Sequence, residues 1–113
     1  MNRGEIWWAG LPGPKASDPG YSRPVLIVQS DAFNRSRIQT VVVIALTSNL
    51  RLADAPGNVK LSARKTGLPK NSVANISQII TLDKTFLRDK SGKLDEATIT
   101  HVEDGIKLLL GFK

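Results

Sequence analysis

Cysteine is absent from this chain of 113 residues, and histidine occurs only once, as His101. Without cysteine there are no disulfides, thiolate nucleophiles, iron–sulfur clusters or cysteine-ligated zinc sites. A single histidine also excludes two-histidine mechanisms and histidine-rich metal sites within one chain. His101 lies about 200° around its predicted helix from Ile99, off the apolar side, so we expect a solvated surface residue.

Long apolar runs and nucleotide-binding glycine patterns are also missing. The longest apolar stretches have about six residues, far below the roughly 18 needed to span a bilayer. Near the N-terminus, Glu5 precedes two tryptophans, where a signal peptide would have an apolar segment. No Gly-x-Gly-x-x-Gly follows a predicted strand, and residues 91–93 lack the preceding glycine of a P-loop. We therefore expect a cytoplasmic protein that contacts no membrane, and these patterns indicate no nucleotide cofactor.

The composition is that of an ordinary globular protein, with 41% hydrophobic and 23% charged residues. The length suits one domain over residues 1–113. Of the 16 Lys and Arg, eight lie between residues 51 and 90, together with three of the 10 Asp and Glu, and the net charge is +6. A folded basic surface attracts polyanions, among which nucleic acid is the commonest in the cytosol. The alternative, that the charge only keeps the protein in solution, stays open.

Short apolar segments separated by glycine, proline and polar residues predict a mostly β protein. We expect strands at residues 5–9, 24–29, 40–46, 58–61, 72–76 and 78–82. Short helical turns are expected at residues 31–34 and 83–87. The predicted architecture is a small, mostly antiparallel β-barrel or curled sheet with a C-terminal α-helix.

The C-terminal segment carries the one long helical pattern. Asp95 is expected as its N-cap, and Gly111 is expected to end it. Its core-facing side should consist of Ile99, Val102, Ile106, Leu109 and Leu110.

Arg23 and Thr47 stand at the ends of two predicted strands. Arg23 immediately precedes Pro24, which holds it in an extended conformation where a glycine- and proline-rich loop meets a buried strand. Thr47 occupies the corresponding place at the end of the central strand. Such strand ends often carry ligand-binding side chains. An arginine there more often has a structural role, so the residues alone leave both interpretations open.

Several blocks of the sequence, taken in order, resemble the MazF/PemK toxins. The first blocks read RGEIW at residues 3–7, SRPVLIV at 22–28 and ALTSN at 45–49. The later ones read TGLPKNSV at 66–73, NISQI at 75–79 and LDK at 82–84. The resemblance covers essentially the whole chain. It implies an SH3-like β-barrel with a C-terminal helix. It also implies a homodimeric toxin, neutralised by an acidic antitoxin, that cleaves single-stranded RNA without a metal.

By the same resemblance, the catalytic residues are Arg23 and Thr47, with Asp18 as the acid of the first loop. We expect RNA to contact polar and basic residues on the strand ends and loops around them. These are Tyr21, Ser22, Ser48, Asn49, Arg64, Lys65, Lys70, Ser77 and Gln78. The first loop departs from the family pattern at residues 16 and 19–22, so the sequence that is cleaved stays open.

RNA carries its own nucleophile, the 2′-hydroxyl, so the protein has to orient the phosphate and stabilise its charge. Arg23 can donate two hydrogen bonds to the phosphate oxygens, and Thr47 can hold the phosphate in line. Arginine is a poor proton acceptor because its pKa lies above about 12. Asp18 is therefore either the group that takes the 2′ proton or the group that orients Arg23.

Aromatic residues are few, and we expect Trp8 and Phe33 in the core. Trp8 should share a strand face with Ile6, while Trp7 points to the opposite face. Trp7, Tyr21 and Phe33 are candidates for stacking on nucleobases, and Trp7 is also a candidate for a dimer contact.

Two other functions remain as alternatives. A gyrase-poisoning toxin of the CcdB type would share the fold without being an enzyme. That family acts through a Trp-Gly-Ile tail, whereas this chain reads Gly-Phe-Lys at residues 111–113. A non-catalytic nucleic-acid-binding barrel is supported only by the charge.

Overall fold

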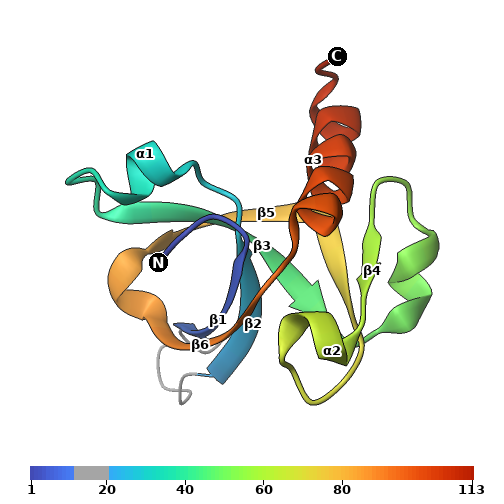
Figure 1. The fold of residues 1–113 in the computed structure, drawn as a ribbon, viewed down its shortest axis with the longest axis horizontal. Helices are drawn as coiled ribbons and strands as arrows, with labels where there is room; N and C mark the ends of the chain where they lie inside the picture. The colour runs from blue at the N-terminus through green and yellow to red at the C-terminus, as the bar shows by residue number, and fades with distance from the viewer. Residues whose placement is uncertain (12–20) are drawn as a thin grey trace.

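The computed structural model describes residues 1–11 and 21–113, with only the backbone described at residues 11 and 21. These residues form six strands, a C-terminal helix and several short helical turns (Figure 1). The strands are β1 (Glu5–Leu11), β2 (Tyr21–Ile27), β3 (Thr40–Thr47), β4 (Val59–Leu61), β5 (Ser72–Asp83) and β6 (Leu87–Lys93). The helices are α1 (Asp31–Asn34), α2 (Ala63–Thr66) and α3 (Glu96–Leu110), and the 3-10 turns are η1 (Leu50–Asp54) and η2 (Lys84–Phe86).

All the strands belong to one antiparallel sheet with the order β4-β5-β3-β2-β1-β6. The sheet curls on itself, so that β1, β2, β3, β5 and β6 form a partial barrel (Figure 1). The expected fold class is confirmed: a curled antiparallel sheet with a C-terminal helix and short helical turns.

Hydrophobic side chains fill both faces of the sheet. One cluster includes Ile6, Leu26 and Ile44 and packs against α3. The other includes Val25, Ile27 and Val43, which alternation places on the opposite face of the sheet. The central strands β2 and β3 therefore have both faces covered, as their almost entirely apolar sequences predict.

Two predictions about strands were wrong. Residues 72–76 and 78–82 belong to one strand, β5, because a bulge lets it bend while it stays paired with β3. The partners shift from Ile44–Ile79 to Leu46–Ala74 across this bulge. The edge strand β6 was not predicted, because its residues are polar and partly exposed and lack the alternating apolar pattern.

Helix α3 begins and ends where the sequence predicts. Asp95 caps it, since its Oδ1 accepts a hydrogen bond from the Thr98 backbone N at 2.8 Å. Gly111 follows the helix in the left-handed conformation, with φ of 77°. Within the described ranges, no helix is long and apolar enough to cross a membrane.

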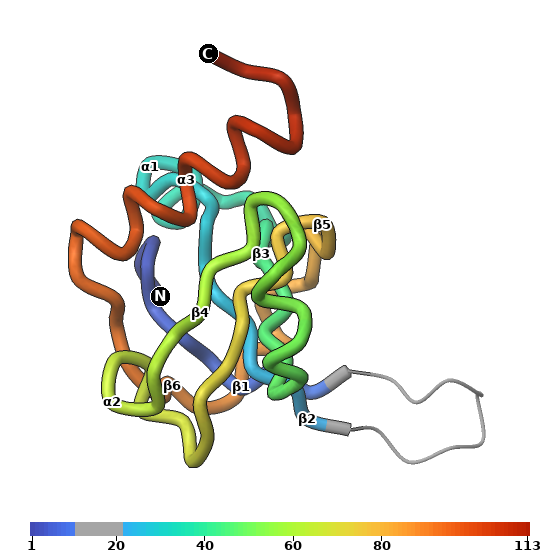
Figure 2. Tube along the Cα trace, turned by 90° about the vertical axis from the view of Figure 1, so that its right-hand side faces the viewer, coloured from blue at the N-terminus to red at the C-terminus, as the bar shows by residue number. Residues whose placement is uncertain are grey.

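The apolar side of α3 is shorter than predicted. Val102 is buried, and Ile99 and Ile106 pack on the first cluster. Leu109 and Leu110 are 47% and 52% exposed, because the last turns of the helix project past the sheet (Figure 2). The expectation that these two leucines face the core was wrong for that reason.

The aromatic residues divide between the faces of β1. Trp8 packs on the cluster of Ile6, and Trp7 packs on the opposite cluster, as the alternation predicts. Phe33 is 57% exposed on the single turn α1, so its predicted place in the core was wrong. A helix of one turn has no long buried side to hold such a side chain. His101 is exposed, as expected.

Glu5 is a buried carboxylate at the start of β1. Burial raises the pKa of Glu5, but hydrogen bonds from Trp7 Nε1 (2.9 Å) and Asn2 N (2.9 Å), with Lys90 Nζ at 3.1 Å, outweigh it. The pKa of Glu5 therefore lies below its ordinary value. The ionised group ties the N-terminus and β6 to β1.

We expect the Glu5 carboxylate to make the protein less stable in acid. Its contribution is fully present above the ordinary pKa of 4.5 and is lost as the pH falls through the lowered value. Glu5→Gln should therefore destabilise the protein most near neutral pH and progressively less below about pH 4.5. Denaturant unfolding of both proteins across this range measures the difference, and a difference that does not change with pH would contradict the assignment.

Candidate functional site

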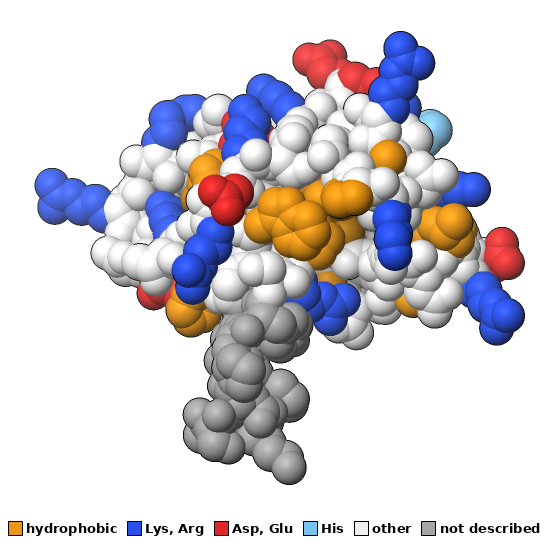
Figure 3. Space-filling view, turned by 90° about the horizontal axis from the view of Figure 1, so that it is seen from below, with side chains coloured by type: hydrophobic (Ala, Val, Ile, Leu, Met, Phe, Trp, Pro, Cys, Tyr) orange, Lys and Arg blue, Asp and Glu red, His pale blue; other side chains and the backbone are white. Residues whose placement is uncertain are grey.

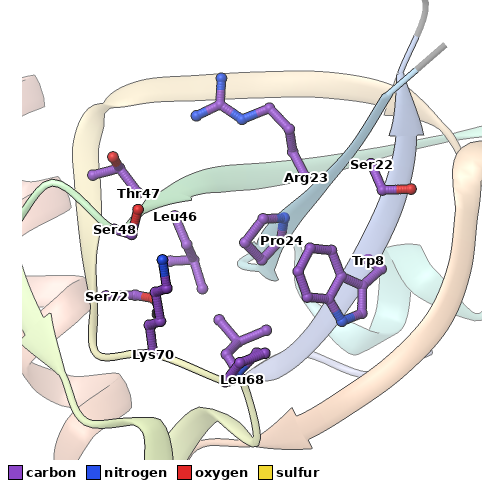
Figure 4. Close-up of a pocket in the computed structure, with 11 residues that line it drawn as sticks. Trp8, Ser22, Arg23, Pro24, Leu46, Thr47, Ser48, Leu68, Lys70 and Ser72 are labelled. Atoms are coloured by element: carbon purple, nitrogen blue, oxygen red, sulfur yellow. Dashed lines mark hydrogen bonds between the residues drawn. The ribbon is translucent and has the colours of Figure 1, made fainter. Parts of the chain in front are cut away.

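A cavity of about 350 Å³ opens where the pairing of β2 with β3 ends, beside the loop that leads into β5 (Figure 4). The prediction that Arg23 precedes the strand was wrong, because β2 begins at Tyr21 and Arg23 pairs with Ala9 of β1. The walls of the cavity combine apolar side chains with hydroxyls and two cations. The lining residues are Trp8, Ser22, Arg23, Pro24, Leu46, Thr47, Ser48, Leu68, Pro69, Lys70 and Ser72. On the face of the molecule seen in Figure 3, hydrophobic side chains gather in the middle and Lys and Arg side chains surround them.

The register of β2 and β3 brings Arg23 and Thr47 together. Val25 pairs with Ala45, and Leu26 with Ile44. The pairing stops at Val25–Ala45, and continuing the same register by two residues aligns Arg23 with Thr47 across the opening, with both on one face by alternation. Both residues therefore line the same cavity at one end of the two central strands.

The register is held at the far end of the two strands by Gln29. Its Nε2 donates to Thr40 O (3.2 Å) and to Asn34 Oδ1 (3.0 Å), and its Oε1 accepts from Val42 N (3.2 Å). Asn34 Nδ2 donates back to Gln29 O at 3.0 Å. Both faces of these strands are apolar, so alternation alone does not select one register. The amides of Gln29 and Asn34 select it.

Proline opens the cavity at the other end. Pro24 has no N–H to donate, and the β2–β3 pairing accordingly ends at Val25 and Ala45. On its other side Pro24 stays opposite Trp8 of β1. The ends of β2 and β3 are therefore free to separate, and the cavity lies in the space between them.

The hydroxyl of Thr47 is oriented by the turn that follows it. Thr47 Oγ1 accepts a hydrogen bond from Asn49 N at 3.2 Å, and Asn49 Oδ1 caps η1 by accepting from Arg51 N at 3.2 Å. A hydroxyl that accepts from the backbone keeps its own hydrogen for a ligand. Thr47 can therefore donate a hydrogen bond into the cavity.

Lys70 reaches the cavity from the opposite wall. The loop that carries it follows Gly67, which ends α2 in the left-handed conformation, and is anchored by the buried Leu68. Leu68 N also donates to Thr66 Oγ1 at 3.1 Å. Among the described residues, no carboxylate lines the cavity. Two cations and several hydroxyls without a nearby acid form a site suited to an anion such as a phosphodiester.

Five of the residues predicted from the sequence meet in this cavity: Ser22, Arg23, Thr47, Ser48 and Lys70. Asn49 lies next to it and caps η1. Asp18 and the side chain of Tyr21 lie outside the described residues.

The remaining predicted contacts lie away from the cavity. Arg64 and Lys65 are on α2, where Lys65 Nζ donates to Thr98 Oγ1 at 2.8 Å and lies 3.7 Å from Asp95 Oδ2. Ser77 and Gln78 are exposed within the bulged part of β5.

The sequence did not identify Trp8 as a site residue. Trp8 was expected only in the core, but it both packs on the core and lines the cavity. Leu68 and Pro69 complete the apolar wall beside it. The pair of adjacent tryptophans was the signal that could have identified Trp8. Alternation along β1 places the two on opposite faces, and Trp7 is the one that binds Glu5, so Trp8 lies on the face of the cavity.

Comparison with known proteins agrees with the resemblance seen in the sequence. Residues 2–110 match the profile of the family described as PemK-like, MazF-like toxin of type II toxin-antitoxin system. The chain is 44% identical over 110 residues to endoribonuclease MazF6 of Mycobacterium tuberculosis, covering 97% of this chain and 96% of the relative. It is 34% identical to endoribonuclease EndoA of Bacillus subtilis, covering 97% and 94%.

A solved structure supports the same conclusion. An endoribonuclease in complex with its cognate antitoxin, from a mycobacterial species, superposes with a TM-score of 0.79 at 27% identity and covers 100% of this chain and 97% of its own. The chain belongs to the PemK-like, MazF-like toxin family of type II toxin–antitoxin systems.

Proposed function

We propose that this protein is an endoribonuclease toxin that cleaves single-stranded RNA at specific sequences, without a metal. The observation that carries the proposal is the meeting of Arg23 and Thr47 in a cation-lined cavity between strand ends. The relatives at 44% and 34% identity are endoribonucleases, which favours this function over a gyrase poison or a passive binding barrel. We also propose that the protein acts in the cytoplasm, where cellular RNA is present.

In the proposed reaction the 2′-oxygen of one nucleotide attacks the adjacent phosphorus. The 2′ proton leaves to a base, and the bond from phosphorus to the 5′-oxygen breaks as that oxygen takes up a proton. The products are a 2′,3′-cyclic phosphate and a 5′-hydroxyl. Arg23 donates to the non-bridging oxygens, whose negative charge grows in the transition state, and the Thr47 hydroxyl donates to the same phosphate.

Asp18 is the third proposed catalytic residue. It is the only acid in the loop between β1 and β2. Its role is either to take the 2′ proton or to orient Arg23. Ionised aspartate serves both purposes, since it accepts protons and hydrogen bonds but donates none.

The proposed RNA path extends from the cavity along its rim. Lys70 holds a neighbouring phosphate, and the hydroxyls of Ser22 and Ser48 bind the sugar–phosphate chain. Tyr21 and Asn49 are proposed contacts to the bases. The proposed contacts farther along the surface are Arg64, Lys65, Ser77 and Gln78.

The proposed protein partners are a second copy of this chain and an acidic antitoxin. A related endoribonuclease was solved with its cognate antitoxin, which supports the second. The end of α3 supports the first, because Leu108, Leu109, Leu110 and Phe112 leave an apolar surface exposed there. A basic cavity rim is complementary to an acidic peptide, so we propose that the antitoxin occupies the same groove as RNA.

We expect purified protein to cut a long single-stranded RNA into discrete fragments in the presence of EDTA. Arg23→Ala and Thr47→Ala should each lower the cleavage rate by about 100-fold or more, because each removes a donor to the developing charge. Both residues lie at the cavity rim, so the free energy of unfolding should change by less than about 1 kcal/mol. The fragments should be labelled by polynucleotide kinase without prior removal of a phosphate, because they carry a 5′-hydroxyl.

The controls separate the three candidate functions. Arg37→Ala, which removes an exposed arginine after α1, should cleave like the wild type. Intact RNA with trapped gyrase–DNA complexes would indicate the gyrase poison. A shifted but intact RNA band would indicate the binding barrel. A folded Arg23→Ala protein that cleaves at the wild-type rate would remove Arg23 from the catalytic site.

RNA binding should depend strongly on salt. With four or five phosphate contacts, the logarithm of affinity should fall with the logarithm of salt concentration with a slope of about −3 to −3.5. Lys70→Ala should flatten this slope by about 0.7, the value for one phosphate on a single strand. Lys60→Ala removes the same charge from β4, outside the cavity, and should leave the slope unchanged. Affinities of 2′-O-methyl RNA, which has no nucleophile, provide the measurement, and equal slopes for the two variants would contradict the proposed place of Lys70.

We expect the protein to be a dimer at micromolar concentration. Exposed leucines and Phe112 at the end of α3 lose their contact with water when two copies associate. Sedimentation equilibrium measures the mass in solution. A monomer of 12.3 kDa at those concentrations would contradict the expected homodimer.

A further inference from the structure

Arg88 lies across the backbone of Gly10, next to the cavity. A Cβ atom at Gly10 would come within 2.5 Å of Arg88 Nε, 2.7 Å of its Nη2 and 2.9 Å of its Cζ. The guanidinium therefore occupies the space that a side chain at position 10 would fill. Glycine at this position is what allows Arg88 to lie over β1.

Alternation along β1 shows on which face the guanidinium lies. Ile6 and Trp8 point to one face of β1, and the missing side chain of Gly10 would point to the same face. Gly10 pairs with Ser22, and both Ser22 and Trp8 line the cavity. Two residues of strand span about 7 Å, so Arg88 continues the cavity wall just beyond Trp8. In Figure 4 this is the side of Trp8 and Ser22, across the opening from Lys70.

A bulge between β1 and β6 directs Arg88 to this place. Trp8 pairs with Asp89 and Ala9 with Leu87, so Arg88 lies at the shift in register and has no partner of its own on β1. Bulges commonly redirect a side chain in this way. The side chain then crosses β1 toward the cavity.

The charge of Arg88 has no acidic partner within residues 1–11 and 21–113. The three salt bridges of this region join Arg3 to Glu103, Lys65 to Asp95 and Lys90 to Glu5. Arg88 is also exposed. Its guanidinium can donate hydrogen bonds to a phosphate, and among the described residues no ion pair has to break first.

Trp8 supplies a flat apolar surface between Arg88 and the catalytic residues. It is half-buried, and its contacts with the core cluster hold the indole in place. Pro24 and Leu68 extend the apolar wall beside it (Figure 4). An indole fixed by the core loses little freedom when a nucleobase stacks on it. A fixed aromatic surface next to an exposed guanidinium matches the two parts of a nucleotide, its base and its phosphate.

We propose that Trp8 and Arg88 form a nucleotide subsite, in which one base of the RNA stacks on the indole and the adjoining phosphate pairs with the guanidinium. The proposal rests on the proposed function, because it requires RNA in the cavity. It adds one base contact and one phosphate contact on the side opposite Lys70. RNA would then cross the cavity from Lys70, past Arg23 and Thr47, to Arg88.

The test uses a 2′-O-methyl oligonucleotide that carries the cleavage sequence found with the wild-type protein, and copies in which one base at a time is removed. Trp8→Leu should weaken binding about tenfold, whereas Trp8→Phe, which keeps an aromatic ring, should bind nearly as well as wild type. Removing the base that stacks on Trp8 should also lower the affinity of the wild type about tenfold. The same removal should not lower the affinity of Trp8→Leu further, because both changes delete the same contact.

Arg88 is tested through the salt dependence. Arg88→Ala should flatten the slope by about 0.7, and Arg88→Lys should restore it, since a phosphate contact needs only the charge. Lys60→Ala, which also lowers the net charge by one, is the matched control and should leave the slope unchanged. A guanidinium that merely covers β1 would affect the stability of the protein and leave the slope as it is.

Because Trp8 also packs on the core, circular dichroism must show that Trp8→Leu is folded. A second measurement does not depend on that variant. In Trp7→Phe, Trp8 is the sole tryptophan, and its fluorescence should be quenched by the intact oligonucleotide and much less by the copy that lacks the stacking base.

The outcomes separate the subsite from the proposed function. If the wild type cleaves RNA while the Trp8 and Arg88 variants bind it with unchanged affinity and slope, the subsite is wrong and the function stands. If the wild type binds single-stranded RNA without cleaving it, the function fails. Affinities for a 2′-O-methyl copy of the bound RNA, and for copies that lack one base, then still decide the subsite. A wild type that neither binds nor cleaves RNA would overturn both.

Discussion

The hydrogen bonds between the amides of Gln29 and Asn34 hold the register on which the site depends. They join the end of β2 to the start of β3 across the turn that contains α1. Since both faces of these strands are apolar, a slip by one residue would leave the burial pattern nearly unchanged and would move Arg23 away from Thr47. A polar cluster at one end of the sheet thus holds the register that aligns the proposed catalytic residues, Arg23 and Thr47, at the other end.

The cavity exists because that pairing stops. Pro24 cannot extend the β2–β3 ladder, and Thr47 ends β3 with its hydroxyl held by the turn of η1. The positive charges of Arg23 and Lys70 therefore lie at a solvent-facing edge, where their desolvation costs little. The apolar wall of Trp8, Pro24 and Leu68 continues the core to the same edge. A stable core and a charged site share these strands without competing for the same positions.

Much of the fold could be predicted from the sequence, because buried strands and an amphipathic helix have local signatures. The apolar run of β3, the Asp95 cap and the Gly111 stop of α3 are examples. The failures also have physical causes. Strand β6 is held by backbone pairing at an edge and lacks an apolar alternation. The bulge within β5 depends on its pairing with β3, which no local pattern records. Leu109 and Leu110 continue the helical pattern beyond the point where the sheet ends.

For the site, the sequence by itself identified the family, and the resemblance to that family predicted the chemistry. The residue types at the strand ends, and the motif blocks in order along the chain, pointed to Arg23, Thr47 and an RNA phosphate. Only the tertiary structure decided which other side chains share the cavity. It placed Lys70 across from Arg23, directed Lys65 to Thr98 at the start of α3, and laid Arg88 over Gly10 beside Trp8. The reason is that neighbours in a sheet are chosen by strand order, register and bulges, which bring distant residues together and leave no mark on the spacing of residues along the chain.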